Sequence, residues 1–286
     1  MVAAAVWCVA AFWGLLVLAY YVGPTSWLDE AALHGFGAVD RPRINGVTTA
    51  IAHICNPLPY ALASAALIVL AIGFRGFRTA AFVGFLLAGA NATSQLLKPA
   101  LAYHRELWDT PWHTYNISDA AYPSGHATAA MAFSLGVLMI VRRAYRPLAA
   151  TLGVAFTLAV SFSILIMRWH FPSDVVGGYL VATAFGLVTI GGLRYVNERW
   201  PERGTVRQAA REAMPAPSMA TIARGVLLLA VVAALIAASR AREIASFAER
   251  HTAAAAVASA IAVAAAVLLA AVVSITSRSR SRSGSR

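Results

Sequence analysis

Two stretches of the chain, Tyr122-Pro-Ser-Gly-His126 and Arg168-Trp-His-Phe-Pro-Ser-Asp174, decide how its fold is interpreted. Each stretch stands directly before an apolar run, and a Pro-Ser pair there is typical of the first turn of a helix. Each stretch also contains a histidine, His126 in the first and His170 in the second. The pattern therefore predicts two membrane helices whose N-terminal ends carry reactive side chains and face each other.

The composition indicates a polytopic membrane protein. Of 286 residues, 59% are hydrophobic and 12% are charged, and the mean hydropathy is +0.68, which argues against a separate soluble domain. The net charge of +11 comes from arginines between the apolar runs, so it indicates membrane topology and no nucleic-acid partner. Cys8 and Cys55 form neither a disulfide framework nor a metal-ligand spacing, and we expect no metal and no other cofactor.

The apolar runs predict an all-α bundle, because a bilayer is crossed by about 20 residues of helix. We expect eight spans, at residues 2–22, 57–73, 79–97, 124–141, 147–167, 172–193, 222–239 and 254–275.

The spans divide the chain into four parts. Residues 1–193 are the expected six-helix core, which includes a mixed segment from Trp27 to Cys55 that fits a helix lying along the membrane surface. Residues 194–221 are rich in Arg, Glu and Pro and predict an exposed cytoplasmic linker. Residues 222–275 contain two further spans, and residues 276–286 form a basic, disordered tail suited to an anionic leaflet.

The basic residues predict the orientation in the cell membrane. Eight spans place both termini on one side, and the arginine-rich connections fall on that same side, which the positive-inside rule makes cytoplasmic. These connections contain Arg75 and Arg78, Arg142, Arg143 and Arg146, the linker and the tail. The remaining polar candidates then lie together at the extracytoplasmic surface: Lys98, Arg105, His126, His170 and Asp174.

The third span carries polar residues at helical spacing, and one of them, Lys98, is the only lysine of the chain. Their spacing of three or four places them on one face, which we expect to look into the bundle because polar groups in hydrocarbon require partners. These residues are Asn91, Ser94, Gln95 and Lys98.

The chemistry of these side chains fits a phosphate group. Two helix N-termini at one level direct N–H groups to an oxyanion, and Lys98 and Arg105 add cations. Asp174 follows His170 by four residues, so its carboxylate reaches ring Nδ1 and leaves Nε2 free to attack, while His126 protonates a leaving oxygen. Taken singly, each feature is ordinary capping or membrane anchoring, but their joint placement favours a site.

At this point the chain resembles a known family. Lys98 and Arg105 seven residues on, Pro-Ser-Gly-His at 123–126, and Ser163 with His170 and Asp174 are similar to the three-part signature of the type 2 phosphatidic acid phosphatase superfamily. The resemblance extends from about Trp7 to Leu193. It implies a six-helix core with an extracytoplasmic pocket that removes phosphate from lipid phosphates or pyrophosphates without metal.

The resemblance also implies roles for individual residues. His170 is the expected nucleophile that forms a phosphohistidine, Asp174 orients it, and His126 is the acid for the leaving group and then the base for water. The phosphoryl oxygens are expected to be held by Lys98, Arg105, Ser124 and Gly125.

Two positions depart from the signature. Glu106 stands where the family has proline, and Ile164 stands where it has a phosphate-binding arginine after Ser163. We expect Arg168 to replace that arginine, because on a continuous helix it lies on nearly the same face, about 6 Å further along the axis.

The leading hypothesis is a metal-independent bacterial phosphatase that acts on a lipid phosphate or a polyprenyl pyrophosphate. The alternatives are a lipid phosphotransferase, in which an alcohol takes the phosphoryl group from His170, and a non-catalytic membrane scaffold that retains the fold. The expected partners are the bilayer and a lipid phosphate, and no pattern predicts an oligomeric state.

Overall fold

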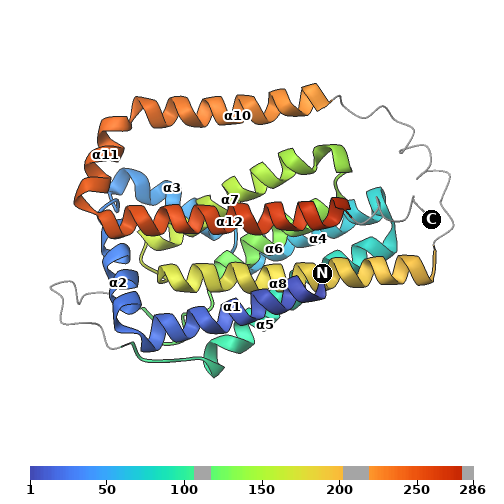
Figure 1. Ribbon diagram of the computed structural model, residues 1–286, viewed down its shortest axis with the longest axis horizontal. Helices are drawn as coiled ribbons and strands as arrows, with labels where there is room; N and C mark the ends of the chain where they lie inside the picture. Colours follow the sequence, from blue (N-terminus) through green and yellow to red (C-terminus); the bar gives the residue numbers. More distant parts are fainter. Residues whose placement is uncertain (106–116, 202–218, 279–286) are drawn as a thin grey trace.

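The computed structural model describes residues 1–105, 117–201 and 219–278, and in these parts all regular structure is helical. The predicted all-α membrane bundle is thereby confirmed (Figure 1). The helices that precede the active-site region are α1 (Val2–Tyr21), α2 (Gly23–Gly37), α3 (Pro42–His53), α4 (Pro57–Arg75) and α5 (Phe77–Ala100). They are followed by α6 (Gly125–Ile140), the short 3-10 helix η1 (Arg143–Tyr145), α7 (Arg146–Ile166) and α8 (Pro172–Arg199).

Six helices of the described residues are long and apolar enough to cross a membrane, which makes the chain a multi-pass membrane protein. They are α1, α4, α5, η1 with α7, α8 and α12 (Thr252–Arg278). Helix α6 is apolar but has only 16 residues, about 24 Å of helix against a hydrocarbon core of about 30 Å. The mixed segment forms the short helices α2 and α3, as predicted, and neither is among the candidate spans.

Helix α6 is the centre of the bundle, and small residues explain its position. It packs against α5, α7 and α8, and most of its residues are buried. Because hydrocarbon gives no hydrophobic drive between helices, close packing of small side chains has to hold them together. The small buried residues of α6 are Gly125, Ala127, Ala129, Ala130, Ala132, Ser134 and Gly136.

The C-terminal part differs from the prediction in three details. Helix α8 continues to Arg199, so the first residues of the expected linker are helical, and Arg194 there donates to the carbonyl of Thr276 (2.7 Å). Helices α10 (Met219–Ser239) and α12 are joined by an unpredicted amphipathic helix, α11 (Ala241–Arg250). The tail was predicted to be disordered from residue 276, but residues 276–278 are the last residues of α12. Residues 202–218 of the linker and 279–286 of the tail lie outside the described residues, as does Glu106.

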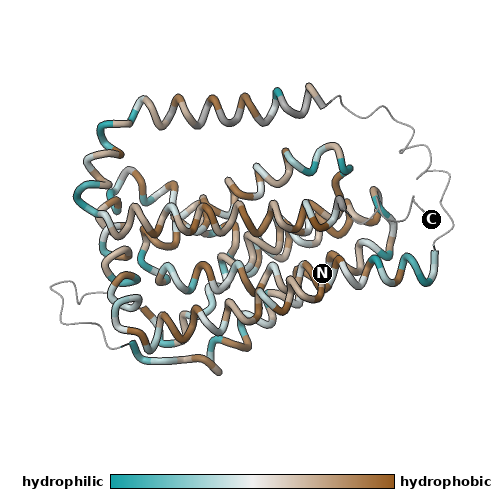
Figure 2. Tube along the Cα trace, viewed as in Figure 1, coloured by the Kyte–Doolittle hydropathy of each residue, from teal (hydrophilic) through white to brown (hydrophobic). Residues whose placement is uncertain are grey.

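The bundle has two chemically different ends. Helices α2 and α11 lie at one end, and the C-terminus of α8 lies at the other (Figure 1). Hydrophilic residues gather toward these ends, while the helices between them are predominantly hydrophobic (Figure 2). We call the end with the first turns of α6 and α8 the histidine end. We call the end with the turn between α6 and α7 the basic end.

Candidate active site

The first turns of α6 and α8 lie side by side at the histidine end. The backbone N–H of Ser124 donates to the carbonyl of Asp174 (2.9 Å), and the Ser124 hydroxyl caps α6 by accepting from Ala127 N–H. Gly178 permits this approach, because a Cβ at that position would lie 2.6 Å from the carbonyl oxygen of Ser124. The sequence prediction that the two histidine-bearing stretches meet is therefore correct.

The two histidines face each other across a short gap. The ring centroids of His126 and His170 are 6.4 Å apart, and His126 also lies 5.6 Å from the ring of Trp169. His126 Nε2 is 3.1 Å from Asn56 Oδ1, a hydrogen bond that places the proton of the ring on Nε2. His170 Nδ1 is 3.5 Å from Asp174 Oδ2, an ion-pair distance longer than a normal hydrogen bond.

The polar face of α5 closes another side of this gap. A Cβ on Gly125 would lie 2.8 Å from Gln95 Nε2 and 3.8 Å from Lys98 Nζ, so both side chains lie against the first turn of α6. Nearer the membrane centre, Asn91 Nδ2 donates to the hydroxyl of Tyr60 (2.8 Å). This polar face therefore looks at α4 and α6, as predicted. It brings a flexible ammonium group to a helix N-terminus, where anions bind.

Arg105 is buried between two carboxylates. Its guanidinium donates to Asp174 Oδ1 and to Asp29 Oδ2, both at 2.8 Å, and its side chain is only 9% exposed. The rings of Tyr20 and Phe171 lie 4.7 and 4.2 Å from the guanidinium carbon. Burial alone lowers the pKa of Arg105, but the two carboxylates raise it above its ordinary value, so the guanidinium stays charged.

Asp29 of α2 also satisfies the first turn of α8. Its Oδ1 accepts the backbone N–H of Ser173 (2.9 Å), and its Oδ2 accepts the Ser173 hydroxyl. The N–H of Phe171 donates to Asp174 Oδ2 (2.9 Å). The sequence predicted free N–H groups at both helix starts. This prediction is wrong for the N–H groups of Phe171 and Ser173 at the start of α8, because both are bonded to carboxylates. Carboxylates of the protein take the place that was predicted for phosphate oxygens.

Comparison with known proteins agrees with this architecture. Residues 76–198 match the family model of the PAP2 superfamily. The undecaprenyl-diphosphatase BcrC of Bacillus subtilis (strain 168) is 31% identical to this chain over 136 residues, which are 45% of this chain and 67% of that protein. The chain belongs to the PAP2 superfamily.

A solved PAP2 structure shows the same fold. The crystal structure of the first transmembrane PAP2 type phosphatidylglycerolphosphate phosphatase from Bacillus subtilis superposes with a TM-score of 0.51 at 19% identity. The superposition covers 70% of this chain and 98% of that one. Since nearly all of the smaller protein is matched, this PAP2 chain has helices beyond the shared fold.

The structure corrects the reasoning that made Arg168 a phosphate ligand in this PAP2 chain. Helix α7 ends at Ile166, and Arg168 has the left-handed backbone angle φ of 55°, so residues 164 and 168 are not on one continuous helix. The Arg168 guanidinium donates to the carbonyl of Gly37 at the C-terminus of α2 (3.1 Å). Ile164 is fully buried in the hydrophobic core, which explains why an apolar residue is accommodated there.

Two residues of this site were missed at the level of sequence. Asp29 was interpreted as part of a polar surface segment, and Asn56 was not singled out at all. Asn56 precedes Pro57 as the N-cap of α4, a position in which asparagine is common. The only available signal for Asp29 was a pair of acidic residues, Asp29 and Glu30, between apolar ones, because its partners Arg105 and Ser173 are 76 and 144 residues away.

The site residues do not resemble a metal centre. In the three described parts of the chain, no three His, Cys, Asp or Glu side chains come together so that they could hold a metal ion. The independence of metal stays a prediction.

Proposed function

We propose that this PAP2 protein is a membrane phosphatase that removes phosphate from a lipid phosphate or from a polyprenyl pyrophosphate. The observation that supports it most is the pair of imidazole rings 6.4 Å apart, with Lys98 and the first turn of α6 beside them. A phosphoryl group fits between one ring as nucleophile and the other as acid. The similarity to an undecaprenyl-diphosphatase favours the pyrophosphate.

In the proposed reaction His170 Nε2 attacks phosphorus, and the bond from phosphorus to the leaving oxygen breaks as His126 gives it a proton. Asp174 stabilises the charge that develops on the His170 ring. His126 then takes a proton from water, whose oxygen attacks the phosphohistidine, and cleavage of the P–N bond releases inorganic phosphate. Lys98, Ser124 and Gly125 bind the phosphoryl oxygens in this scheme.

Arg105 has a different role in our proposal from the one that the resemblance implies. Its guanidinium is already bonded to Asp29 and Asp174, so we assign it to holding Asp174 in place behind His170. Direct binding of phosphate would require it to leave two buried carboxylates, which is costly.

Measurement of phosphate release tests the proposal. Purified protein in detergent is given undecaprenyl pyrophosphate, phosphatidylglycerol phosphate and phosphatidic acid in turn, with and without EDTA. Release that is unchanged by EDTA supports a metal-independent phosphatase. A phosphorylated alcohol in place of free phosphate would make the protein a transferase, and no product from any of these lipids would favour the scaffold.

We further propose that the histidine end faces outward and the basic end faces the cytoplasm. The gathering of arginines at the basic end supports this orientation. Single cysteines at Ser118 and Arg143, in a background that lacks Cys8 and Cys55, are exposed to an impermeant thiol reagent on intact cells. The proposal expects labelling at position 118 alone, and labelling at position 143 alone would reverse the orientation.

A further inference from the structure

Positive charge is concentrated around the turn between α6 and α7 at the basic end. Arg143 lies in this turn and Arg146 begins α7, while Arg75 and Arg194 come from the C-terminal parts of α4 and α8. The strongest charges acting on Arg146 are those of Arg143, Arg75 and Arg194. The carboxylate of Glu198 lies close enough to Arg194 for its negative charge to act on that arginine. Among the described residues, the cluster therefore carries an excess of positive charge.

The hydrogen bonds described for Arg75, Arg146 and Arg194 go to carbonyls and a hydroxyl. Arg75 donates to the carbonyls of Ile140 and Val141 at the end of α6 (2.8 and 2.6 Å). Arg146 donates through Nη1 to the hydroxyl of Thr276 (3.2 Å), while its Nε is buried and has no hydrogen-bond partner in the described part of the chain. Because a buried guanidinium N–H is costly without an acceptor, an anion is the group that fits beside it.

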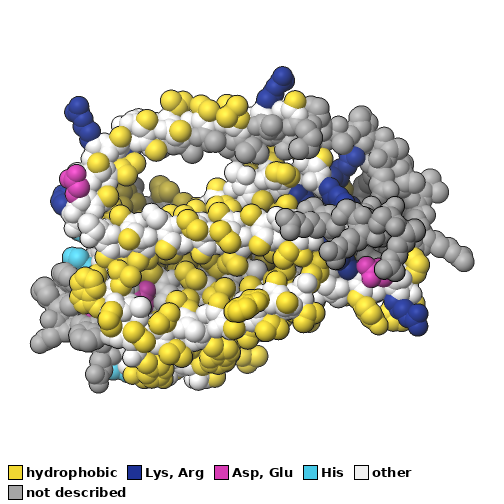
Figure 3. All heavy atoms as spheres, in the orientation of Figure 1, with side chains coloured by type: hydrophobic (Ala, Val, Ile, Leu, Met, Phe, Trp, Pro, Cys, Tyr) yellow, Lys and Arg dark blue, Asp and Glu magenta, His cyan; other side chains and the backbone are white. Residues whose placement is uncertain are grey.

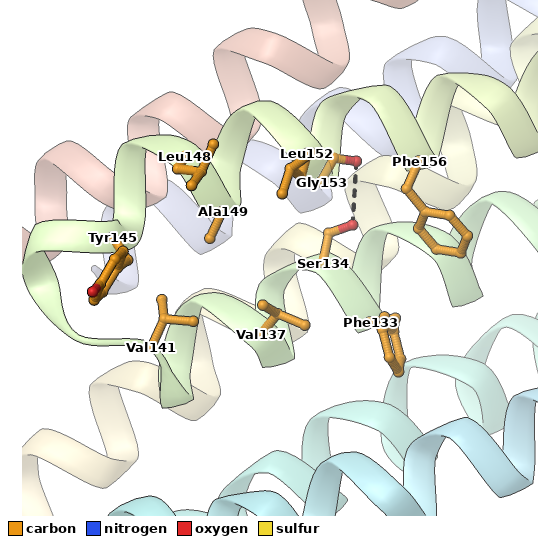
Figure 4. Close-up of a pocket in the computed structure, with 10 residues that line it drawn as sticks. All are labelled: Phe133, Ser134, Val137, Val141, Tyr145, Leu148, Ala149, Leu152, Gly153 and Phe156. Carbon is orange, nitrogen blue, oxygen red and sulfur yellow. Dashed lines mark hydrogen bonds between the residues drawn. The ribbon is translucent and has the colours of Figure 1, made fainter. Parts of the chain in front are cut away.

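An apolar groove begins at the same turn and runs between α6 and α7 (Figure 4). Its volume is about 420 Å³, within the range of small-molecule pockets. Its lining has two hydroxyl groups, those of Ser134 and Tyr145, and the Ser134 hydroxyl is bonded to the carbonyls of Ala130 (2.9 Å) and Gly153 (3.3 Å). The groove thus fits a hydrocarbon chain. Its larger side chains are Phe133, Val137, Val141, Leu148, Leu152 and Phe156.

The position of α10 indicates that lipid reaches this side of the bundle. Helix α10 contacts α7 and η1, and Figure 3 shows a hollow between α10 and the rest of the bundle. At membrane depth, where water is absent, such a hollow is open to lipid chains. Tyr145 lies at the mouth of the groove, as is common for aromatic residues at the membrane interface.

We propose that the basic end is a binding site for an anionic phospholipid. Its headgroup phosphate contacts Arg143 and Arg146, and one acyl chain lies in the groove between α6 and α7. The site is distinct from the candidate active site, because His126 and Val141 are separated by the length of α6, about 22 Å. It does not rest on the proposed function, since the same lipid would bind to a catalytically inactive protein.

Lipid-dependent stability tests this proposal. The purified chain in uncharged detergent is titrated with phosphatidylglycerol, phosphatidylcholine or inorganic phosphate, and the Tm and the lipid retained in native mass spectra are measured. We expect phosphatidylglycerol alone to raise the Tm, with one lipid retained per chain. The variant Arg143→Gln with Arg146→Gln should bind it about 30-fold more weakly, at about tenfold for each 1.4 kcal/mol and about 1 kcal/mol for each arginine.

Two further variants separate the two parts of the site. Ala149→Phe fills the groove and keeps the arginines, and it should also weaken binding of phosphatidylglycerol. Loss of the partly buried Arg146 could impair folding, so the single variant Arg143→Gln is also measured, because Arg143 is exposed. The matched control is Arg240→Gln, since Arg240 is exposed at the histidine end beside α11 and pairs with Glu243.

Four results would overturn the proposal. They are an equal rise in Tm with phosphatidylcholine, an equal rise with inorganic phosphate, unchanged binding in both the arginine and the groove variants, or lipid-induced pairing of two chains. The last result would identify the groove as an interface between copies.

Discussion

Arginines serve opposite purposes at the two ends of the bundle. At the histidine end Arg105 is buried between Asp29 and Asp174, and these bonds tie α2, the loop after α5 and α8 together. At the basic end Arg75 and Arg146 donate to helix carbonyls and a hydroxyl. The comparison teaches that this fold uses ion pairs to hold catalytic candidates in place, and gathers like charges around Arg146 where a membrane supplies counter-ions.

The largest effect is expected from the nucleophile at the histidine end. His170→Ala should reduce turnover by at least about 10³-fold, because no other group can form the covalent intermediate. Asp174→Asn should retain measurable activity, since it only misorients the ring. Phosphate release is the readout, and His104→Ala, at an 82% exposed side chain, is the control. Normal turnover in the His170 variant would remove the assignment.

The second largest effect is expected at the buried ion pair of Asp29 and Arg105. Asp29→Asn should lower kcat by about 10- to 100-fold, the usual range for a residue that holds a catalytic group through its partner. It should also lower the Tm, because Arg105 loses one of its two buried partners. The control is Asp40→Asn, at an exposed position. A lower Tm with unchanged kcat would show that Asp29 only stabilises the fold.

A smaller effect is expected at Asn56, which accepts the proton of His126 Nε2. Asn56→Ala should reduce kcat by about tenfold and leave KM nearly unchanged, because the acid is misoriented while phosphate binding is intact. The dependence of kcat on pH should also shift. The matched control is Asn197→Ala, whose side chain accepts from Arg78 at the basic end. An identical pH profile would contradict the role of Asn56.

The smallest effect is expected at Arg168. An ammonium group can also donate to the carbonyl of Gly37, so Arg168→Lys should change turnover by less than about threefold. Arg105→Lys should cause a much larger loss, because Lys cannot bond two carboxylates as a planar fork does. Equal losses in the two variants would restore Arg168 as a phosphate ligand.

The chain shows where prediction from sequence succeeds and where it fails. Membrane helices such as α4 and α7 were predicted within a few residues, because the bilayer imposes length and apolarity on each helix separately. The amphipathic helix α11 was not predicted. It has only ten residues and lies between two long apolar runs, so its sequence resembles a polar connection. The continuous helix expected from Ile164 to Arg168 was wrong, because the end of α7 depends on how residues 167 to 171 turn toward α8.

The candidate site divides in the same way. Local sequence determined that His126 and His170 each stand at a helix start and that Asp174 follows one turn later, since these relations involve only neighbouring residues. The tertiary structure alone decided that Asp29 and Asn56 join them, and that Arg105 faces carboxylates. Those contacts join residues 69 to 76 positions apart, and only the packing of α2, α4, α6 and α8 around small residues such as Gly178 brings them together.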